Sequence, residues 1–429
     1  MRYSIFLFVA AFAAPAMPVV PIGPIPVTGT RTTINNGPGD QADPHISGDL
    51  ACYVNAITPG FAALRYYNFA TAVDSAIPSD ASLNDILPDV SGNRIAFTRI
   101  LPDRNAIEVF DTVTSTLTEI APQAGTHRFG SAIGNATVAY DDLATGYGVL
   151  FAFDLSAAGS PVQLSSGTGG TQNPKVAASG DVVVWEQCSS LVNCDVMKSI
   201  RSSGSWSAAS LVANSSKNPD TDGTWIVYDS NRPGSLTGRD IYFQALGGGA
   251  ETQLQMAAEQ SNPSISQGVI AFESSASAGS PGDIFVYVIA TNTLYQITST
   301  PTFDDQLSDV SLLPSGDIRV VWIENDGLLG DYNVYAVTFT PTPSAEQQLA
   351  NLASTINGFG LPHGTANSLL AKVDAATASL ASGDTAAACN QLNALINEAE
   401  AQSGKNVPQA QAQTIIDLAQ AALSTLGCP

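Results

Sequence analysis

The sequence predicts a mainly β protein: a seven-bladed β-propeller closed by an N-terminal strand, followed by a small four-helix C-terminal domain. Three observations predict this fold class. A block ending in an aromatic residue recurs seven times, and each copy continues into further short β-branched or aromatic runs bounded by turn residues. After residue 340 the hydrophobic period changes from that of strands to that of helices.

The repeat is marked by one aromatic anchor in each copy. The anchors are Tyr53, Phe97, Tyr140, Trp185, Tyr228, Phe272 and Trp322. Successive anchors are 44, 43, 45, 43, 44 and 50 residues apart. Three or four short strands in a period of that length are typical of a propeller blade.

Closure of the ring is also predicted. The seventh copy ends at "NVYAVTF" without a further strand, and "GTRTTINN" precedes the first anchor in the place of a final strand. We expect this N-terminal strand to complete the last blade, because a closed ring leaves no open edge. The propeller then takes residues 28–340.

The block P-x-[IV]-S-G-x-x-[IV]-A-[FY], followed by D-I-Y or D-I-F, resembles the TolB-type (WD40-like) propeller repeat. It is clearest at residues 88–97, 219–243 and 263–287, and the resemblance covers about 310 residues. It implies the propeller fold. TolB's own N-terminal domain has no counterpart here, and its six blades differ from seven, so the resemblance does not carry TolB's partners over.

A Pro-rich break, "TPTPS" at 340–344, precedes four amphipathic stretches that predict a helical bundle over residues 345–428. Their apolar faces are Leu349, Leu352 and Ile356; Leu369, Leu370, Val373 and Leu380; Leu392, Leu395 and Ile396; and Ile415, Ile416, Ala419, Leu423 and Leu426. The runs "GLPHGTANSLLAKVDAA" and "GDTAAACNQLNALINEAEAQSGK" resemble the FIMAH module of secreted bacterial proteins. That resemblance implies an extracellular modular protein and no particular reaction.

Export is predicted by the N-terminus. Residues 1–16, "MRYSIFLFVAAFAAPA", have the positive start, short apolar run and small-residue cleavage pattern of a signal peptide. We therefore expect a secreted or periplasmic protein with no membrane span in the mature chain. Disulfides become available there, with Cys188 and Cys194 around a hairpin tip and Cys389 and Cys428 in the helical segment as candidates. Cys52, in an apolar strand, is expected to be a buried free thiol.

Charge limits the partners. The chain has 38 acidic and 16 basic residues, a net charge of −22, which argues against nucleic acid and anionic membranes. We expect a monomer that binds a protein or glycan ligand. A cationic ligand would match the negative net charge of the chain. No cofactor is predicted.

The segment "NPDTDGTWIVYD", residues 218–229, has the spacing of an EF-hand calcium loop. Alignment with the other copies argues against a metal site, because Asp222-Gly223 takes the place of the Ser47-Gly48 turn. The residues that follow are then extended, which puts Gly223 and Asp229 roughly 20 Å apart. No metal site is predicted.

The same alignment shows ionisable residues just after the anchors. They are Asp141, Glu186, Asp229, Glu273, Glu324 and Arg99. If the anchor strand is innermost, as is assumed for TolB-like propellers, these residues would surround one mouth of the channel and bind a ligand. The alternative, which we favour, is that each acid accepts hydrogen bonds from amides of its own loop.

No catalytic residues are predicted. The three histidines, His45, His127 and His363, form no zinc motif, and no G-x-S-x-G motif is present. TolB-like pectate-fragment lyases use several channel histidines with a metal, a pattern that the two propeller histidines match poorly. We therefore expect a binding protein that recognises its ligand on the loop face or channel mouth. The alternatives are a polysaccharide-directed lyase or hydrolase using channel carboxylates, and a cell-surface structural or assembly protein.

Overall fold

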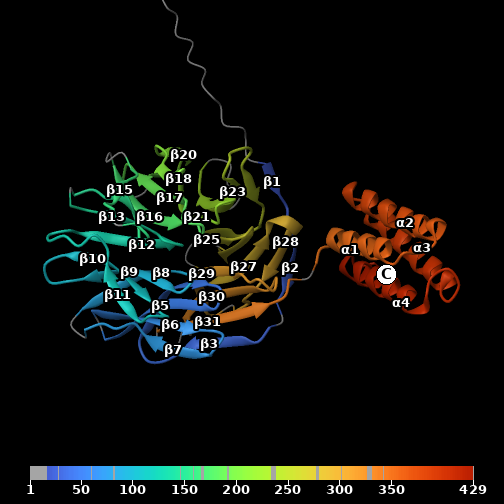
Figure 1. Cartoon of the computed structure of the whole chain (residues 1–429), viewed down its shortest axis with the longest axis horizontal. Helices are drawn as coiled ribbons and strands as arrows, with labels where there is room; N and C mark the ends of the chain where they lie inside the picture. The colour runs from blue at the N-terminus through green and yellow to red at the C-terminus, as the bar shows by residue number, and fades with distance from the viewer. Residues whose placement is uncertain are drawn as a thin grey trace, which may run out of the picture. The chain divides into compact units, whose positions relative to one another are not determined.

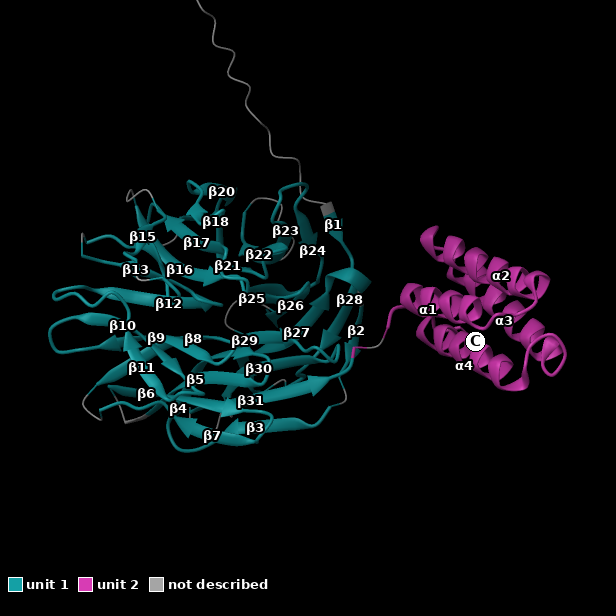
Figure 2. Ribbon diagram, viewed as in Figure 1, with its two compact units in different colours: residues 1–340 teal, residues 341–429 magenta. Residues whose placement is uncertain are grey.

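The computed structural model describes residues 17–27, 29–58, 60–80, 83–144, 146–157, 159–165, 169–190, 193–232, 238–276, 280–300, 302–325, 331–341 and 343–428. The expected signal peptide, residues 1–16, lies outside the described residues. The chain divides into two compact units, residues 1–340 and residues 341–429 (Figure 2). Each unit is described separately below.

The first unit is a seven-bladed β-propeller, as the sequence predicts (Figure 1). Blade 1 contains β4 (Asp40–Ser47), β5 (Leu50–Thr58), β6 (Phe61–Asn68) and β7 (Val73–Ala76). Blade 2 contains β8 (Asn84–Ser91), β9 (Arg94–Ile100), β10 (Asn105–Asp111) and β11 (Thr116–Glu119). Blade 3 contains β12 (Arg128–Gly134), β13 (Thr137–Asp142), β14 (Val149–Asp154) and β15 (Val162–Gln163).

The remaining blades follow the same order. Blade 4 contains β16 (Gly170–Val176), β17 (Val182–Cys188), β18 (Cys194–Ser202), β19 (Ser205–Trp206) and β20 (Ser210–Ala213). Blade 5 contains β21 (Ser216–Thr221), β22 (Trp225–Ser230), β23 (Asp240–Ala245) and β24 (Thr252–Leu254). Blade 6 contains β25 (Glu259–Ser266), β26 (Val269–Ser275), β27 (Gly282–Val288), the 3₁₀ turn η1 (Ile289–Thr291) and β28 (Thr293–Gln296), and blade 7 contains β29 (Asp304–Leu312), β30 (Ile318–Asn325) and β31 (Tyr332–Phe339).

Closure occurs in blade 7, as predicted. The N-terminal strand β3 (Arg31–Asn35) pairs antiparallel with β31, with Arg31 opposite Val337 and Thr33 opposite Tyr335. The ring is therefore joined by two strands that are almost the whole propeller apart in sequence, and the outer edge of β31 is covered.

Two further N-terminal strands were not predicted. β1 (Met17–Val19) lies parallel to β24 of blade 5, and β2 (Ile22–Pro26) lies parallel to β28 of blade 6. Each adds a fifth strand to an outer edge, a sheet position that tolerates the prolines of this run. Residues 17–26 thus pair with the propeller, and such edge pairing leaves no alternating hydrophobic pattern in the sequence.

The strand nearest the axis is the first of each blade. The first strands contact one another in a closed series: β4 with β8, β8 with β12, β12 with β16, β16 with β21, β21 with β25, β25 with β29, and β29 with β4. The aromatic anchors lie on the second strands, where all seven are at most 2% exposed. The assumption that the anchor strand is innermost is therefore wrong. A strand with sheets packed against both faces needs continuous apolar side chains, and the channel-lining strand does not.

The core lies between neighbouring sheets. Ile95, Phe97 and Phe110 of blade 2 pack against Leu50 and Cys52 of blade 1, for example. Cys52 is a fully buried free thiol, as expected, and behaves as a small apolar side chain.

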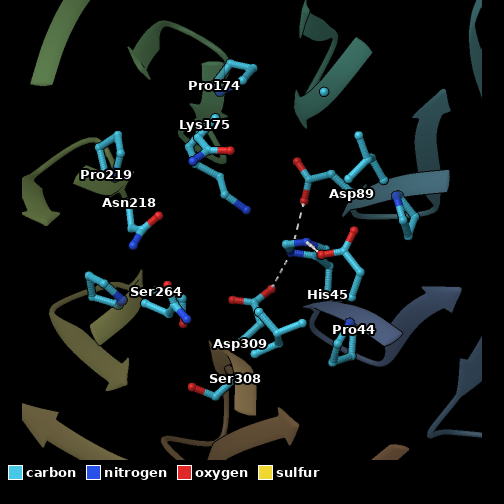
Figure 3. A pocket seen from close by; sticks show the side chains of 18 of the residues that line it. Pro44, His45, Asp89, Pro174, Lys175, Asn218, Pro219, Ser264, Ser308 and Asp309 are labelled. Carbon is cyan, nitrogen blue, oxygen red and sulfur yellow. Dashed lines mark ion pairs between the residues drawn. The ribbon is translucent and has the colours of Figure 1, made fainter. Parts of the chain in front are cut away.

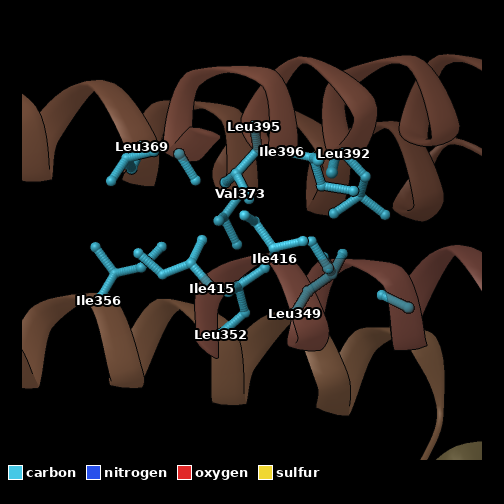
Figure 4. Packing of buried hydrophobic residues seen from close by; sticks show 14 of the residues in the cluster. Leu349, Leu352, Ile356, Leu369, Val373, Leu392, Leu395, Ile396, Ile415 and Ile416 are labelled. Atoms are coloured by element: carbon cyan, nitrogen blue, oxygen red, sulfur yellow. The ribbon is translucent and has the colours of Figure 1, made fainter. Parts of the chain in front are cut away.

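The second unit contains four helices, α1 (Ala345–Gly358), α2 (His363–Ala381), α3 (Thr385–Gln402) and α4 (Gln409–Thr425). The predicted apolar faces meet in one core, with Leu352, Val373, Leu395 and Ile415 fully buried at its centre (Figure 4). A capping box at Ser344 begins α1. A disulfide joins Cys389 of α3 to Cys428. None of the described helices is long and apolar enough to cross a bilayer.

Candidate functional site

A bulge is repeated at the same place in all seven blades. Each first strand shifts register against its second strand, and the residue at the shift has a φ between 48° and 62°. These residues are Asp43, Leu87, Gly130, Asn173, Asn218, Asn262 and Leu307. Gly, Asn and Asp adopt this left-handed conformation most readily, whereas the two leucines adopt it at a cost of about 1–3 kcal/mol.

Proline follows the bulge residue in five blades, at Pro44, Pro88, Pro174, Pro219 and Pro263, and serine follows it in blades 3 and 7. Because proline has no N–H, it fits a bulge, where the ladder hydrogen bond is already lost. The seven bulges surround a cavity of about 210 Å³ on the channel axis (Figure 3). We call it the upper cavity.

A second cavity of about 220 Å³ continues along the axis. Four side chains line both cavities and so separate them: His45, Asp89, Lys175 and Asp309. We call these four residues the waist. Each stands two positions after its bulge residue, on the part of the first strand that faces the axis.

The waist carboxylates connect neighbouring blades. Asp89 accepts from the backbone N–H of Ile133 in blade 3 at 2.7 Å, and Asp309 accepts from that of Ile46 in blade 1 at 2.9 Å. The second oxygen of each carboxylate accepts from the N–H of the next residue in its own strand. Asp220, which lines only the second cavity, makes the same two bonds, to Thr221 and to Ile265 of blade 6.

His45 is enclosed by carboxylates. Its Nδ1 lies 3.3 Å from Asp309 and 3.7 Å from Asp89, and its Nε2 lies 3.5 Å from Asp43. Burial and the charge of Lys175 would lower the pKa of His45, but the hydrogen bonds to Asp309 and Asp43 outweigh them and raise it to about 10. His45 is therefore an imidazolium at neutral pH, with both ring nitrogens engaged.

Lys175 has no such partner. Among the described residues no hydrogen bond or ion pair within 4 Å involves its ammonium group, which extends towards the channel centre from blade 4 (Figure 3). Burial would lower the pKa of Lys175, but the surrounding carboxylates, Asp89 first, raise it. Two hydroxyls on the upper cavity, Ser264 Oγ and Ser308 Oγ, are likewise buried without a partner.

The predicted acidic ring lies one strand behind the channel. Glu186 of blade 4 accepts from the side chain of Asn173, its own bulge residue, at 2.8 Å, and from the backbone N–H of Asn218, the next blade's bulge residue, at 2.8 Å. Asp229 repeats this between Asn218 and Asn262.

Glu273 repeats it again between Asn262 and Leu307. The acids thus form a chain of carboxylates that holds the bulges of blades 4 to 7. They accept hydrogen bonds, as the favoured alternative predicts, but each acid also accepts one from the backbone N–H of the next blade's bulge residue and not only from its own blade.

The other predicted members have different partners. Asp141 accepts from Thr171 Oγ1 of blade 4, and Glu324 accepts from Nη1 and Nη2 of Arg31 at 2.8 and 2.7 Å. Arg99 donates two bonds of 2.8 Å to Asp85 in its own blade. None of these three reaches the upper cavity, because the first strand lies between them and the axis.

The calcium-like segment 218–229 forms a hairpin. Asp222 caps the turn by accepting from the N–H groups of Thr224 and Trp225, and its second oxygen accepts from Gly268 of blade 6 at 2.7 Å. Ser47, Ser91, Ser266 and Ser311 hold the next blade from the equivalent place. Asp222 and Asp229 bind donors at opposite ends of β22, as the alignment indicates.

Cys188 and Cys194 pair across β17 and β18 and form a disulfide. Together with Glu186 they are a cluster whose ligand atoms lie within 4.8 Å of one another. The bonded sulfurs are not thiolates, so the oxidised protein does not offer them to a metal. Of the other histidines, His127 is exposed on the propeller, and His363 begins α2 of the second unit.

The waist residues were missed by the sequence analysis, although a signal for them exists. In the aligned repeat, the position after the bulge proline or serine is occupied by His45, Asp89, Ala132, Lys175, Asp220, Ser264 and Asp309. Five of these seven are ionisable. The column would have been recognised had the first strand been assigned to the axis.

Comparison with known proteins supports the propeller fold. No family model matches the chain, and no curated protein matches it. Among solved structures, a puromycin-hydrolysing peptidase from Mycobacterium tuberculosis superposes with a TM-score of 0.51 at 14% identity, over 68% of this chain and 52% of that one. The β-propeller domain of the trilobed protease from Pyrococcus furiosus, described as having an open velcro topology, gives 0.52 at 14% identity, over 70% and 95%.

Acylaminoacyl peptidase from Pyrococcus horikoshii gives a TM-score of 0.51 at 12% identity, over 70% of this chain and 51% of that one. The chain therefore spans about half the length of the two peptidases, and at these identities the similarity establishes the propeller fold alone. A protein from Agrobacterium tumefaciens described as TolB is a further structural neighbour, at 17% identity, over 55% of this chain and 98% of that one, with a TM-score of 0.39.

Proposed function

We propose that the chain is an exported ligand-binding protein whose propeller holds its ligand in the upper cavity, without chemical turnover. One observation carries the proposal: the upper cavity of about 210 Å³ is bounded by seven equivalent bulges and contains polar groups that have no partner among the described residues. A concave site with a few convergent polar groups is the usual form of a ligand site.

Export is supported by independent features. The two disulfides suit an oxidising compartment. β1 begins at Met17, directly after the expected signal peptide, so cleavage there would leave β1 and β2 in place. The four-helix unit, proposed to be a FIMAH-type module, would belong to an extracellular modular protein.

We retain the proposal that Asp141, Glu186, Asp229, Glu273, Glu324 and Arg99 contribute to ligand binding. Glu186, Asp229 and Glu273 hold the bulges of blades 4 to 7, and these three acids would therefore act by positioning the cavity wall. Replacing Glu186 and Glu273 together with Gln should then weaken binding, and an unchanged affinity would reject the role.

The binding proposal is tested by filling the upper cavity of the full mature chain. Ser131, which is 7% exposed, lines the upper cavity at a bulge. Ser131→Phe should abolish binding of any ligand that a peptide or glycan array identifies, whereas Ser131→Ala should bind normally. Melting temperatures confirm that both variants fold, and full binding by folded Ser131→Phe would contradict the proposal.

A polysaccharide-directed lyase or hydrolase remains the alternative, and one observation favours it. Burial raises the pKa of Asp220 to about 7, partly opposed by the charge of Lys175, so this carboxyl titrates near neutral pH. His45, as an imidazolium, is not a base at that pH. Turnover of acidic or neutral polysaccharides that is lost in Asp220→Asn would establish the enzyme and overturn binding alone.

A structural or surface-assembly role for the helical unit is the third candidate. Deletion of residues 341–429 tests it directly. Loss of the protein from the cell surface, with the propeller still binding its ligand, would assign attachment to the helices.

A further inference from the structure

We propose that the ligand of the upper cavity is the C-terminal end of a peptide: its carboxylate binds Lys175, and an aliphatic last side chain packs against the bulge prolines. The inference rests on the proposed function and specifies the class of ligand.

The carboxylates of the upper cavity have little left to bind. Both oxygens of Asp89 and of Asp309 accept backbone N–H groups, and His45 lies against both residues and Asp43. A cationic ligand would compete with these internal donors for the same oxygens. The match between an acidic chain and a cationic ligand, suggested by net charge alone, is therefore not what the hydrogen bonding favours.

Among the described residues, the groups of the upper cavity that have no partner can all donate hydrogen bonds, and the Lys175 ammonium group can only donate. The Lys175 ammonium group has three N–H bonds, and Ser264 and Ser308 each have one O–H. A ligand group rich in acceptors would satisfy them, and a charged acceptor would do so most strongly. An anion is the group that the upper cavity lacks.

The charged residues around the upper cavity favour a ligand group with one negative charge over a group with two. Three carboxylates, Asp43, Asp89 and Asp309, face two cations, His45 and Lys175, around the upper cavity. One further negative charge can pair with Lys175, but a dianionic phosphate would be repelled by the three carboxylates. A carboxylate is the monoanion of this kind that biological polymers commonly carry.

The wall above the waist selects the rest of the ligand. The five prolines that follow bulge residues, with Leu87 and Leu307, form an aliphatic wall, and no Phe, Tyr or Trp among the described residues lines the upper cavity. Sugar rings and nucleobases are commonly bound by stacking on aromatic side chains, which this wall does not offer. An aliphatic side chain beside a terminal carboxylate matches both the wall and Lys175.

The test measures binding of N-acetylated tripeptides ending in Leu, Ile or Val to the full mature protein by isothermal titration calorimetry. Each peptide is used as the free acid and as the C-terminal amide. The proposal expects binding of the free acids only, and roughly 10- to 100-fold weaker binding by Lys175→Met, the usual effect of losing one charge-assisted hydrogen bond. Lys175→Arg should bind more tightly than Lys175→Met.

Lys405→Met is the matched control, because it removes the same charge from an exposed position in the helical unit. It should bind like the wild type, and Ser264→Ala/Ser308→Ala should fall between the wild type and Lys175→Met. Equal binding of amides and acids, or unchanged binding by a folded Lys175→Met variant, would overturn the inference.

Binding confined to uronate oligosaccharides or to basic peptides would also overturn it, as would no binding of any free acid at 10 mM. In those cases the proposed function is judged separately. It stands if the ligand that does bind is lost in Ser131→Phe, and it fails if that ligand still binds.

Discussion

Glu186 provides the sharpest test of how the channel wall is held. Its side chain is fully buried on β17 and accepts from Gln172 Nε2, Asn173 Nδ2 and the N–H of Asn218, each at 2.8 Å. Glu186→Ala would leave these three donors without their acceptor. At about 1.5 kcal/mol each, the low end for hydrogen bonds to a charged group, we expect a loss of roughly 4 kcal/mol in the free energy of unfolding.

Glu186→Gln should cost less, about 1–2 kcal/mol, because one carbonyl oxygen can still accept from Asn173 and Asn218. The assay is urea unfolding of the full mature chain at pH 7, followed by tryptophan fluorescence. Asp103→Ala is the control, because the Asp103 side chain is 67% exposed and its ion pair with Arg104, at 3.5 Å, is a surface pair. This substitution should change the free energy of unfolding by less than about 0.5 kcal/mol.

The refuting result is clear. If Glu186→Ala costs less than about 1 kcal/mol and matches Asp103→Ala, the acids do not hold the bulges. A loss in Glu186→Gln as large as that in Glu186→Ala would show that the charge, and not the acceptor geometry, is the important property.

Three further predictions follow from the described contacts. Replacing Cys389 and Cys428 with Ser should destabilise the helical unit by about 4 kcal/mol, because the disulfide closes a loop of sequence separation 39. Replacing Cys188 and Cys194, whose sequence separation is 6, should destabilise the propeller by about 2 kcal/mol. Urea unfolding monitored by circular dichroism measures both losses, and equal losses would contradict the prediction. Burial raises the pKa of Asp141 to about 7, so the folded state holds a proton that the unfolded state has released above pH 4, and the stabilisation is lost as pH rises through 7. The stability of the wild type should fall by about 3 kcal/mol more than that of Asp141→Asn between pH 5 and pH 8, and parallel pH profiles would exclude this role. Arg31→Ala should lower the free energy of unfolding by about 2 kcal/mol and speed proteolysis near the N-terminus, because β3 is then held less firmly. Arg31→Lys should be intermediate, because lysine cannot make the two parallel hydrogen bonds to Glu324. An unchanged rate of cleavage would show that strand pairing alone closes the ring.

The sequence by itself determined the fold to a considerable depth. The anchors at Tyr53, Phe97 and their counterparts predict the number of blades, because each marks a strand that must be buried on both faces. Closure by residues 31–35 and the faces of the four helices were also predictable, since strand and helix periods are local properties of the chain. The turn at Asp222-Gly223 could be distinguished from a calcium loop by comparison with the other repeats alone.

Only the tertiary structure decided which strand lines the channel. A local pattern distinguishes a strand that is buried on both faces from one that is not, but it does not state the order of strands from the axis outwards. That order moved Glu186, Asp229 and Glu273 from the predicted mouth to a layer behind it, where they hold the bulges.

The same order brought His45, Asp89, Lys175 and Asp309, which are up to 264 residues apart in sequence, around one cavity. Whether a charge in this ring has a partner depends on distances across the channel between side chains of different blades. His45 and Lys175 occupy equivalent positions in the repeat, yet His45 is enclosed by three carboxylates and Lys175 has no partner among the described residues. That difference arises because each blade faces different neighbours across the axis, and no local sequence pattern records those neighbours.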